Sequence, residues 1–172
     1  MRICYNTKSE KLAMGMQKLK YLLILLIISA HALAATEKLP IPRFATIKSS
    51  EANARKGPGV QYPTTHVYQY KHLPVEVIAE YEKWRQVRDI KGDEGWIHSS
   101  ILSGKRSVIL ISKSVETLHQ NNNLKSKIVA KLMPNLICSL NKCIKSWCKI
   151  KCENHTGWIS RAAIWGVYAH EF

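Results

Sequence analysis

Hydrophobic and polar positions follow one pattern twice along the chain. In each copy a Trp is followed by an aliphatic residue three positions on, a basic residue, a polar turn and then Gly-Trp-Ile. The copies occupy residues 84–102 and 147–165, and their first Trp residues are 63 positions apart. A repeat of roughly 60 residues is too long for a solenoid unit and suits a small barrel that folds by itself. The pattern therefore predicts an all-β chain with two tandem copies of one small domain.

The strand before the first copy is expected to form a hairpin with it. Residues 75–81 alternate apolar side chains with mostly polar ones, as a half-buried strand does, and residues 82–83 then turn the chain into Trp84. In a regular strand Trp84 and Val87 face opposite sides, so a core Val87 places Trp84 on an outer, groove-forming side. The alternative is a bulge that turns both side chains inward.

A sharp turn and a long loop are expected before this hairpin. Alternating small residues lead into Gly57-Pro58-Gly59, where positive φ at Gly57 is expected to reverse the chain. Residues 60–73 contain several Tyr residues without sustained periodicity, which predicts a long structured loop. In the second copy, residues 116–123 replace the Gly-Pro turn with an Asn-rich stretch.

Short apolar runs open each copy and close the chain. Residues 44–48 predict the first strand, and residues 107–111 predict its counterpart in the second copy. Residues 136–143 predict an apolar strand before Trp147. Residues 164–172 are more aromatic than a frayed tail, so we expect this end to be packed against the domains.

The first residues have the pattern of an export signal. A basic flank precedes an apolar run of eight residues at 21–28, and Ala32-Leu33-Ala34 supplies small residues for a signal peptidase. We therefore predict a signal peptide at residues 1–34, cleaved after Ala34, and a lead-in linker at residues 35–42. The run is too short to span a bilayer, so no transmembrane segment is expected after processing; a retained anchor is the alternative. Three start codons are compatible with this signal: Met1, Met14 and Met16.

The charge of the chain favours anionic partners. The predicted signal peptide holds five basic residues and one acidic residue, which leaves 21 basic and 11 acidic residues, a net charge of +10. A positive field attracts polyanions such as nucleic acid, anionic lipid or the acidic polymers of a bacterial envelope. Export argues against nucleic acid as the partner. The alternative is a solvated surface that only keeps the protein soluble.

Four cysteines remain after the predicted cleavage, at positions 138, 143, 148 and 152. In an oxidising compartment an even number of cysteines indicates disulfides, and the gaps of four, four and three residues differ from the paired spacing of zinc sites, which are the alternative. Directly paired residues of an antiparallel hairpin have a constant index sum. The nested pairs Cys143–Cys148 and Cys138–Cys152 give 291 and 290, whereas the crossed pairs give 286 and 295. Nested disulfides are therefore predicted, with a β-bulge between Cys138 and Cys143.

The residues also resemble a known family. The matching motifs of the first copy are Asn53-x-Arg55-x-Gly57-Pro58, Leu73-Pro74-Val75-x-Val77, Trp84-x-x-Val87-Arg88-Asp89 and Gly95-Trp96-Ile97-His98. They look like the bacterial SH3 domain. The second copy is similar to the tandem SH3-like exported proteins of bacteria, through Cys143-x-x-x-Trp147-Cys148 and Ile164-Trp165-Gly166-Val167-Tyr168.

This resemblance implies two SH3-like β-barrels of five to six strands, at residues 43–106 and 107–172, with no cofactor. Many such domains accompany cell-wall enzymes and bind peptidoglycan or its peptide stems. The second copy lacks the Arg-x-Gly-Pro element, so a ligand role of that element is not carried over to it.

Catalysis is not expected from this sequence. A cell-wall cysteine peptidase needs a thiolate, a nearby His and a polar orienting group in a domain of its own, but both halves are occupied by the repeats. No H-E-x-x-H, Gly-x-Ser-x-Gly or phosphate-binding Gly loop occurs in the chain. We therefore predict a protein that is not an enzyme and holds no metal or cofactor.

A binding groove is the remaining interpretation. Aromatic side chains provide contact area and charges provide orientation, and the first copy offers Arg55, Tyr62, Tyr68, Trp84 and Trp96. Structural alternatives exist: Trp96 as a core residue, and Arg55 as a donor to loop carbonyls. The predicted partner is cell-wall peptidoglycan or its peptide stems, in the periplasm or outside the cell. The alternative is a periplasmic adaptor or scaffold that binds an envelope protein.

Overall fold

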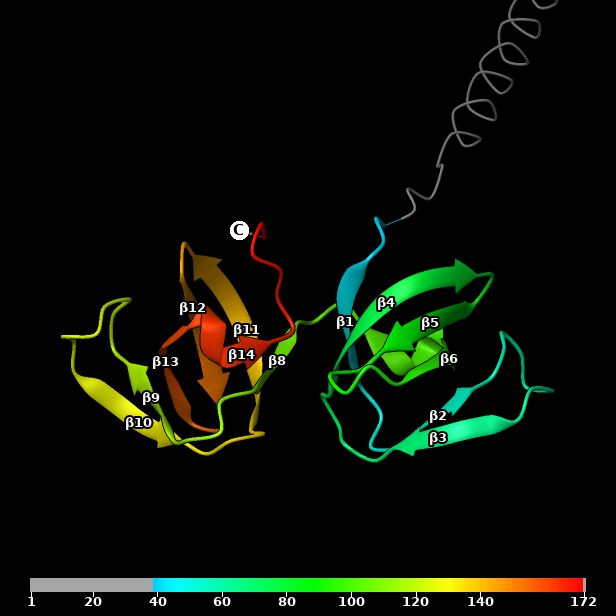
Figure 1. Cartoon of the computed structure of the whole chain (residues 1–172), viewed down its shortest axis with the longest axis horizontal. Coiled ribbons are helices and arrows are strands. Elements are labelled where there is room, and N and C mark those ends of the chain that lie inside the picture. Colours follow the sequence, from blue (N-terminus) through cyan, green and yellow to red (C-terminus); the bar gives the residue numbers. More distant parts are fainter. Residues whose placement is uncertain (1–38, 172) are drawn as a thin grey trace, which may run out of the picture. The chain divides into compact units, whose positions relative to one another are not determined.

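The computed structural model describes residues 39–171, so the predicted signal peptide, its cleavage site and the first half of the lead-in linker lie outside the described residues. The described part forms two seven-stranded antiparallel sheets, each curled into a small barrel (Figure 1). None of its helices is long and apolar enough to cross a membrane. The all-β prediction with two tandem domains is confirmed.

The first barrel has the strand order β3-β2-β6-β5-β4-β1-β7. Its strands are β1 (Arg43–Ile47), β2 (Ala52–Arg55), β3 (Thr64–Tyr68), β4 (Pro74–Tyr81), β5 (Trp84–Arg88), β6 (Glu94–His98) and β7 (Leu102–Ser103). A 3-10 helix, η2 (Ser99–Ile101), turns the chain from β6 into β7, which pairs with β1.

The second barrel repeats this topology with the order β10-β9-β13-β12-β11-β8-β14. Its strands are β8 (Ser107–Leu110), β9 (Glu116–His119), β10 (Ile128–Leu132), β11 (Ile137–Ile144), β12 (Trp147–Cys152), β13 (His155–Ser160) and β14 (Ile164–Trp165). The 3-10 helix η3 (Arg161–Ala163) takes the place of η2. Each element of one barrel therefore has a counterpart in the other.

Each sheet has seven strands, where the family resemblance implies barrels of five to six. One cause is the two-residue closing strands β7 and β14. Another is β3, which lies within residues 60–73; the prediction of a loop for the whole of that segment is wrong. Four of the five residues of β3 are not buried, so the strand lacks the apolar alternation that identifies strands in a sequence.

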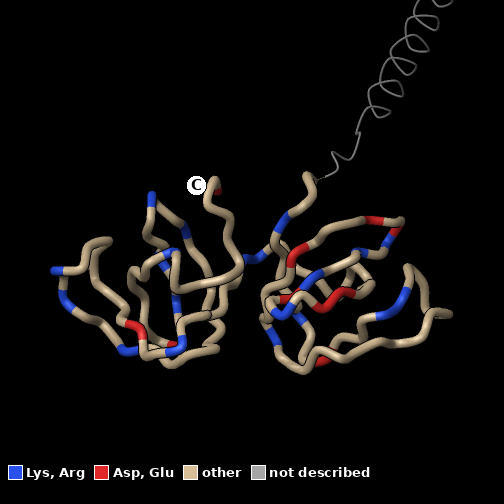
Figure 2. Tube along the Cα trace, in the orientation of Figure 1, with Lys and Arg blue, Asp and Glu red and all other residues tan. Residues whose placement is uncertain are grey.

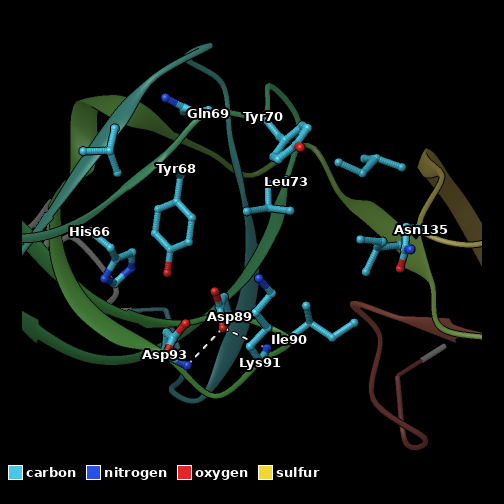
Figure 3. A pocket seen from close by; sticks show the side chains of 13 residues that line it. His66, Tyr68, Gln69, Tyr70, Leu73, Asp89, Ile90, Lys91, Asp93 and Asn135 are labelled. Carbon is cyan, nitrogen blue, oxygen red and sulfur yellow. Dashed lines mark hydrogen bonds between the residues drawn. The ribbon is translucent and has the colours of Figure 1, made fainter.

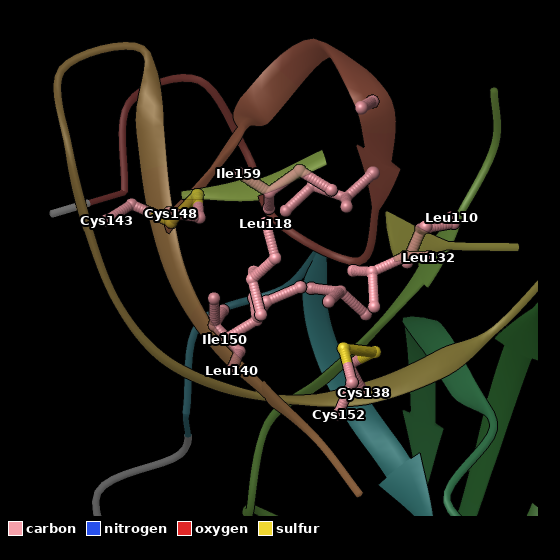
Figure 4. Close-up of a cluster of buried hydrophobic side chains, with 13 residues drawn as sticks. Leu110, Leu118, Leu132, Cys138, Leu140, Cys143, Cys148, Ile150, Cys152 and Ile159 are labelled. Atoms are coloured by element: carbon pink, nitrogen blue, oxygen red, sulfur yellow. A yellow bond between two sulfur atoms is a disulfide. The ribbon is translucent and has the colours of Figure 1, made fainter. Parts of the chain in front are cut away.

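Each barrel has its own hydrophobic core. The first is built on the fully buried side chains of Ile47, Val75, Val77, Val87 and Ile97. The second is built on Val108, Leu110, Leu118, Ile150 and Ile159, with the four cysteines among them (Figure 4). Burial of an aliphatic side chain of this size contributes about 1.5–3 kcal/mol, so each small core is a substantial part of the stability of its barrel.

The Gly of each Gly-Trp-Ile motif lies where two strands cross closely. A Cβ atom on Gly95 in β6 would lie 2.7 Å from the Cβ of Ala54 in β2. A Cβ atom on Gly157 in β13 would lie 2.6 Å from the carbonyl oxygen of His119 in β9. Only Gly allows this approach, so it closes each barrel.

Gly57 has a different role from the one expected. Within the described residues, positive φ occurs among the glycines at Gly92 and Gly166, and Gly57 is not one of them. A Cβ on Gly57 would instead lie 2.6 Å from the ring of Tyr62. The constraint at Gly57 is therefore space for the Tyr62 ring, and the expectation of a left-handed conformation is wrong.

The β11–β12 hairpin contains two disulfides in the nested arrangement. Cys138 pairs with Cys152, with Cα atoms 4.6 Å apart, and Cys143 pairs with Cys148. The register of the hairpin shifts between Leu140 and Lys142, so one extra residue lies between Cys138 and Cys143, as the index sums require. All four cysteines are buried against the second core (Figure 4).

The C-terminal segment is packed, as its aromatic composition predicts. The ring of Tyr168 lies 4.6 Å from that of Phe44, and Trp165 makes an edge contact with Phe44 at 4.9 Å. Arg106 donates hydrogen bonds of 2.9 Å to both carboxylate oxygens of Glu171. Burial alone would raise the pKa of Glu171, but the hydrogen bonds and charge of Arg106 outweigh it and lower that pKa.

We expect Gly157→Ala to lower the free energy of unfolding by about 1–3 kcal/mol, because the new methyl group meets a backbone oxygen that cannot rotate away. Gly104→Ala is the control, since a Cβ there meets nothing within 4 Å. Urea unfolding of both variants measures the difference. Equal stability of the two variants would contradict the close crossing of β9 and β13.

Replacing Cys138 and Cys152 together by Ser should lower the free energy of unfolding by about 3 kcal/mol, since the bridge closes a 14-residue separation in the unfolded chain. The same replacement at Cys143 and Cys148, five residues apart, should cost about 2 kcal/mol. Urea unfolding compares the variants, and peptide mass mapping without reduction checks the pairing. Crossed pairs or free thiols would refute the nested scheme.

Candidate binding face of the first barrel

The outer face of the β5–β6 hairpin carries two of the predicted Trp residues. The strands pair without interruption, with Trp84 opposite His98 and Gln86 opposite Trp96. Val87 lies on the other side of β5 and is fully buried. Because β5 is regular, Trp84 points outward, as strand parity predicts. The bulge of this hairpin lies in β4, between Val77 and Ala79, and does not turn Trp84 inward.

Trp96 lies on the same outer face and not in the core. Its neighbour Ile97 is fully buried, whereas Trp96 itself is half-buried. Arg55 of β2 pairs directly with Trp96, which places the two side chains on one side of the sheet. Strands distant in the sequence therefore bring Arg55 beside the Trp residues.

Arg55 also organises the neighbouring loop. Its guanidinium donates hydrogen bonds to the carbonyl oxygens of Tyr62, at 2.8 Å, and Val60, at 3.2 Å. The side chain of Tyr62 is 39% exposed and its ring covers Gly57. Arg55 thus has the structural role expected as the alternative, and this role ties the backbone of Tyr62 to the residue that pairs with Trp96.

Tyr68 is separated from the other four predicted residues. It faces the interior of the barrel and is only 6% exposed. Its hydroxyl points into a pocket at the β5–β6 turn, away from the outer face (Figure 3). Tyr68 pairs directly with the buried Ala52, and directly paired residues share one side of a sheet. The inward position of Tyr68 follows from this pairing of β2 with β3, which the sequence does not reveal.

His98 is a surface residue of this face that sequence reasoning missed. Its ring makes an edge contact with Trp84 at 5.4 Å. Its Nδ1 accepts the backbone N–H of Ser100, which leaves Nε2 as the donor of the neutral ring. Strand alternation could have identified His98 in the sequence, because it comes two residues after Trp96 and so faces the same side of β6. We call Arg55, Trp84, Trp96 and His98, with Tyr62 in the adjoining loop, the outer face.

The sequence of both barrels matches one family model. Residues 48–104 and 118–166 match the bacterial SH3 domain. The chain belongs to the bacterial SH3 domain family. Each matched segment lies within one of the two predicted domains, at residues 43–106 and 107–172.

Two solved structures are similar to this tandem SH3 chain, NlpC2 and NlpC1 from Trichomonas vaginalis. NlpC2 is 12% identical, with a TM-score of 0.36, over 78% of this chain and 52% of that chain. NlpC1 is 14% identical, with a TM-score of 0.33, over 78% of this chain and 49% of that chain. The chain thus spans about half the length of these structures. No curated protein matches it.

The second SH3 barrel has a different outer face. Trp147 and Trp158 occupy the positions of Trp84 and Trp96, and His119 takes the position of Arg55 opposite the second Trp. His119 is 5% exposed and its Nδ1 donates to the carbonyl oxygen of Ser126. Trp158 is also buried, whereas Trp147 is half-buried like Trp84, so this barrel has one partly exposed Trp at the equivalent place where the first has two.

Lysines lie beside Trp158 on the outer side of the second SH3 barrel. Lys142 and Lys149 are directly opposite each other, and the ammonium of Lys142 lies 5.9 Å from the ring centre of Trp158. Lys151 is on the same side of β12. Like charges placed opposite each other are unfavourable in an isolated sheet. We call Lys142, Lys149 and Lys151 the lysine face.

The two SH3 barrels also differ in how their charges are balanced. In residues 39–171 the ion pairs are all formed by arginines, and four of them lie in the first barrel, among Arg43, Arg85 and Arg88 and three glutamates. Acidic residues accompany the basic ones in the first barrel and are sparse in the second (Figure 2). The lysine face therefore keeps an unneutralised positive field.

Proposed function

We propose that the protein is a non-catalytic exported module that binds peptidoglycan or its peptide stems in the bacterial envelope, in the periplasm or outside the cell. Membership of the bacterial SH3 family supports a cell-wall-related binding role. Two disulfides in a small domain support an extracytoplasmic location. The observation that carries the proposal is the outer face of the first barrel.

The outer face has the chemistry of a ligand surface for sugars and peptides. Trp84 and Trp96 are half-buried, so each is anchored in the sheet and still offers part of its ring to a ligand. Large rigid aromatic rings provide contact area at a small cost in conformational entropy. His98 adds a hydrogen-bond donor on the same side of the hairpin.

The lysine face supplies attraction at longer range. Three lysines without a carboxylate partner in the described ion pairs create a field that favours the anionic polymers of a cell envelope. Such a field acts over about 8 Å at physiological salt, so it assists approach and gives weak binding by itself. Selectivity is then left to the outer face of the first barrel.

The absence of catalysis is part of the proposal. Within residues 39–171 all four cysteines are paired in disulfides, so this part of the chain offers no thiolate for a cysteine peptidase mechanism. The strands and connections of two SH3 barrels occupy residues 43–165. A separate catalytic domain has no room there.

Purified murein sacculi should retain the protein at low salt, and Trp84→Ala or Trp96→Ala should weaken retention by about tenfold, because each removes an aromatic anchor. Leu124→Ala is the control, since Leu124 is 78% exposed in a loop of the other barrel. Sedimentation of sacculi with increasing protein concentration measures the affinities.

Three outcomes would contradict this proposal. Release of soluble muropeptides would show that the protein is an enzyme. No retention at low salt would exclude a wall ligand. Recovery of one defined envelope protein, with no retention on sacculi, would favour the adaptor or scaffold alternative.

The lysine face should account for most of the salt dependence of binding. Changing Lys142, Lys149 and Lys151 together to Gln should weaken retention at low salt and flatten its dependence on salt concentration. Lys56, Lys83 and Lys105 of the first domain, all exposed, changed together to Gln form a control with the same change in net charge. Equal losses in the two triple variants would mean that net charge alone, and not this face, attracts the wall.

A further inference from the structure

A pocket at one end of the first barrel has a polar, acidic floor. Its volume is about 550 Å³, and its walls come from β3, the loop after it, the β5–β6 turn and the second barrel (Figure 3). Tyr68 and His66 reach it from β3, and Asp89, Lys91 and Asp93 reach it from the turn. None of these residues except Tyr68 was expected to take part in binding.

Two buried polar atoms in this pocket lack a hydrogen-bond partner. They are the hydroxyl oxygen of Tyr68 and Nε2 of His66. Tyr68 is only 6% exposed, and Figure 3 shows its hydroxyl directed toward Asp89 and Asp93. A buried polar group without a partner is unfavourable, and native proteins rarely keep one unless a ligand or a water completes it.

The turn holds one carboxylate in a fixed position. Oδ1 of Asp89 accepts the backbone N–H groups of Lys91, at 2.8 Å, and Asp93, at 3.0 Å. This leaves Oδ2 of Asp89 available to a ligand. Burial raises the pKa of Tyr68, and the negative charges of Asp89 and Asp93 raise it further, so their field reaches the hydroxyl.

We propose that this pocket binds a primary ammonium group. Two carboxylates and the oxygen of Tyr68 offer acceptors from different directions, which suits the three N–H donors of an ammonium. Lys91 also lines the pocket and leaves one negative charge in excess, which disfavours an anionic group at the site beside the two carboxylates. Tyr70, which is 68% exposed, adds aromatic surface at the rim.

The second barrel cannot form an equivalent pocket, because its register places apolar residues there. Leu132 pairs with the first residue of β9, as Tyr68 pairs with the first residue of β2, and Ala130 corresponds to His66. Cys152, held in a disulfide, corresponds to Asp89. The protein should therefore bind one ammonium group per chain.

The ammonium site itself does not depend on the proposed wall-binding function. Only the choice of a stem peptide as the molecule that carries the ammonium rests on that function. A stem peptide carries a free ammonium in two places: on the side chain of its diamino acid when that residue is not cross-linked, and on its N-terminus after release from the glycan. Recognition of either group would direct the protein to peptides that have not been cross-linked or that have been cut.

The test uses a tripeptide, Ala-γ-Glu-Lys, in three chemical forms titrated into the full chain by calorimetry. One form has only its N-terminus acetylated, one has only its lysine acetylated, and one has both acetylated. At least one singly acetylated form should bind with a stoichiometry of one, and the doubly acetylated form should bind about tenfold more weakly or worse. The form that binds identifies the source of the ammonium.

Variants locate the binding in the pocket. Asp89→Asn and Asp93→Asn should each weaken binding of the ammonium peptide by about tenfold or more. Asn at position 89 retains an oxygen for the two backbone N–H groups, and the side chain of Asp93 is exposed, so both variants should fold. Tyr68→Phe should weaken binding by about three- to tenfold. Glu82→Gln is the charge-matched control, in the β4–β5 turn at the opposite end of β5.

The outcomes separate this inference from the proposed function. Equal binding of all three peptides, no binding of any, or unchanged binding by both Asp variants would overturn the ammonium site. If sacculi are still retained in those cases, the wall-binding proposal stands without it. Binding of a singly acetylated peptide that is lost in the Asp variants supports the site, even if sacculi are not retained and the wall-binding proposal fails.

Discussion

The close crossing of two strands at a glycine is the constraint on which each barrel depends. Gly95 lets β2 approach β6, and Gly157 lets β9 approach β13. Because the Gly must face the crossing strand, strand alternation then determines which way the next two side chains point. The next residue, a Trp, must face away from the core, and the one after it, an Ile, must fill the core. The same glycine therefore closes the barrel and places the Trp on its outer side. This explains why Gly-Trp-Ile recurs as a unit.

The two barrels stabilise the same bulged hairpin by different means. Glu80 and Arg85 are cross-strand partners that form a 2.8 Å ion pair in the first barrel, and Cys143 and Cys148 hold the equivalent positions in the second. A partly exposed ion pair contributes at most about 1 kcal/mol, whereas a disulfide that closes a loop of this size contributes about 2 kcal/mol. Cys152, which forms the other disulfide with Cys138, occupies the position that Asp89 has in the first barrel. The second barrel is thus more constrained, but it lacks the acidic turn from which a pocket can be built.

This divergence divides the surface chemistry between the copies. The first barrel pairs arginines with glutamates and holds Trp84, Trp96 and His98 half-buried on its outer face. The second covers its equivalent Trp158 and presents lysines opposite each other. An unpaired positive face is useful for attraction at a distance, and a partly buried aromatic face is useful for contact. Two copies of one fold thus carry different surface chemistry in a single chain.

The sequence by itself determined what depends on neighbouring residues. Alternation along residues 75–81 and the parity of Trp84 and Val87 describe one hairpin, and the index sums of the cysteines describe another, because hairpin partners are close in the chain. Only the tertiary structure decided what depends on distant strands. It paired Arg55 with Trp96, made a strand of exposed residues in β3, and turned Tyr68 inward toward Asp89. Local periodicity records which side of a strand a residue occupies, but the partner across the sheet is selected by barrel closure, which no short segment encodes.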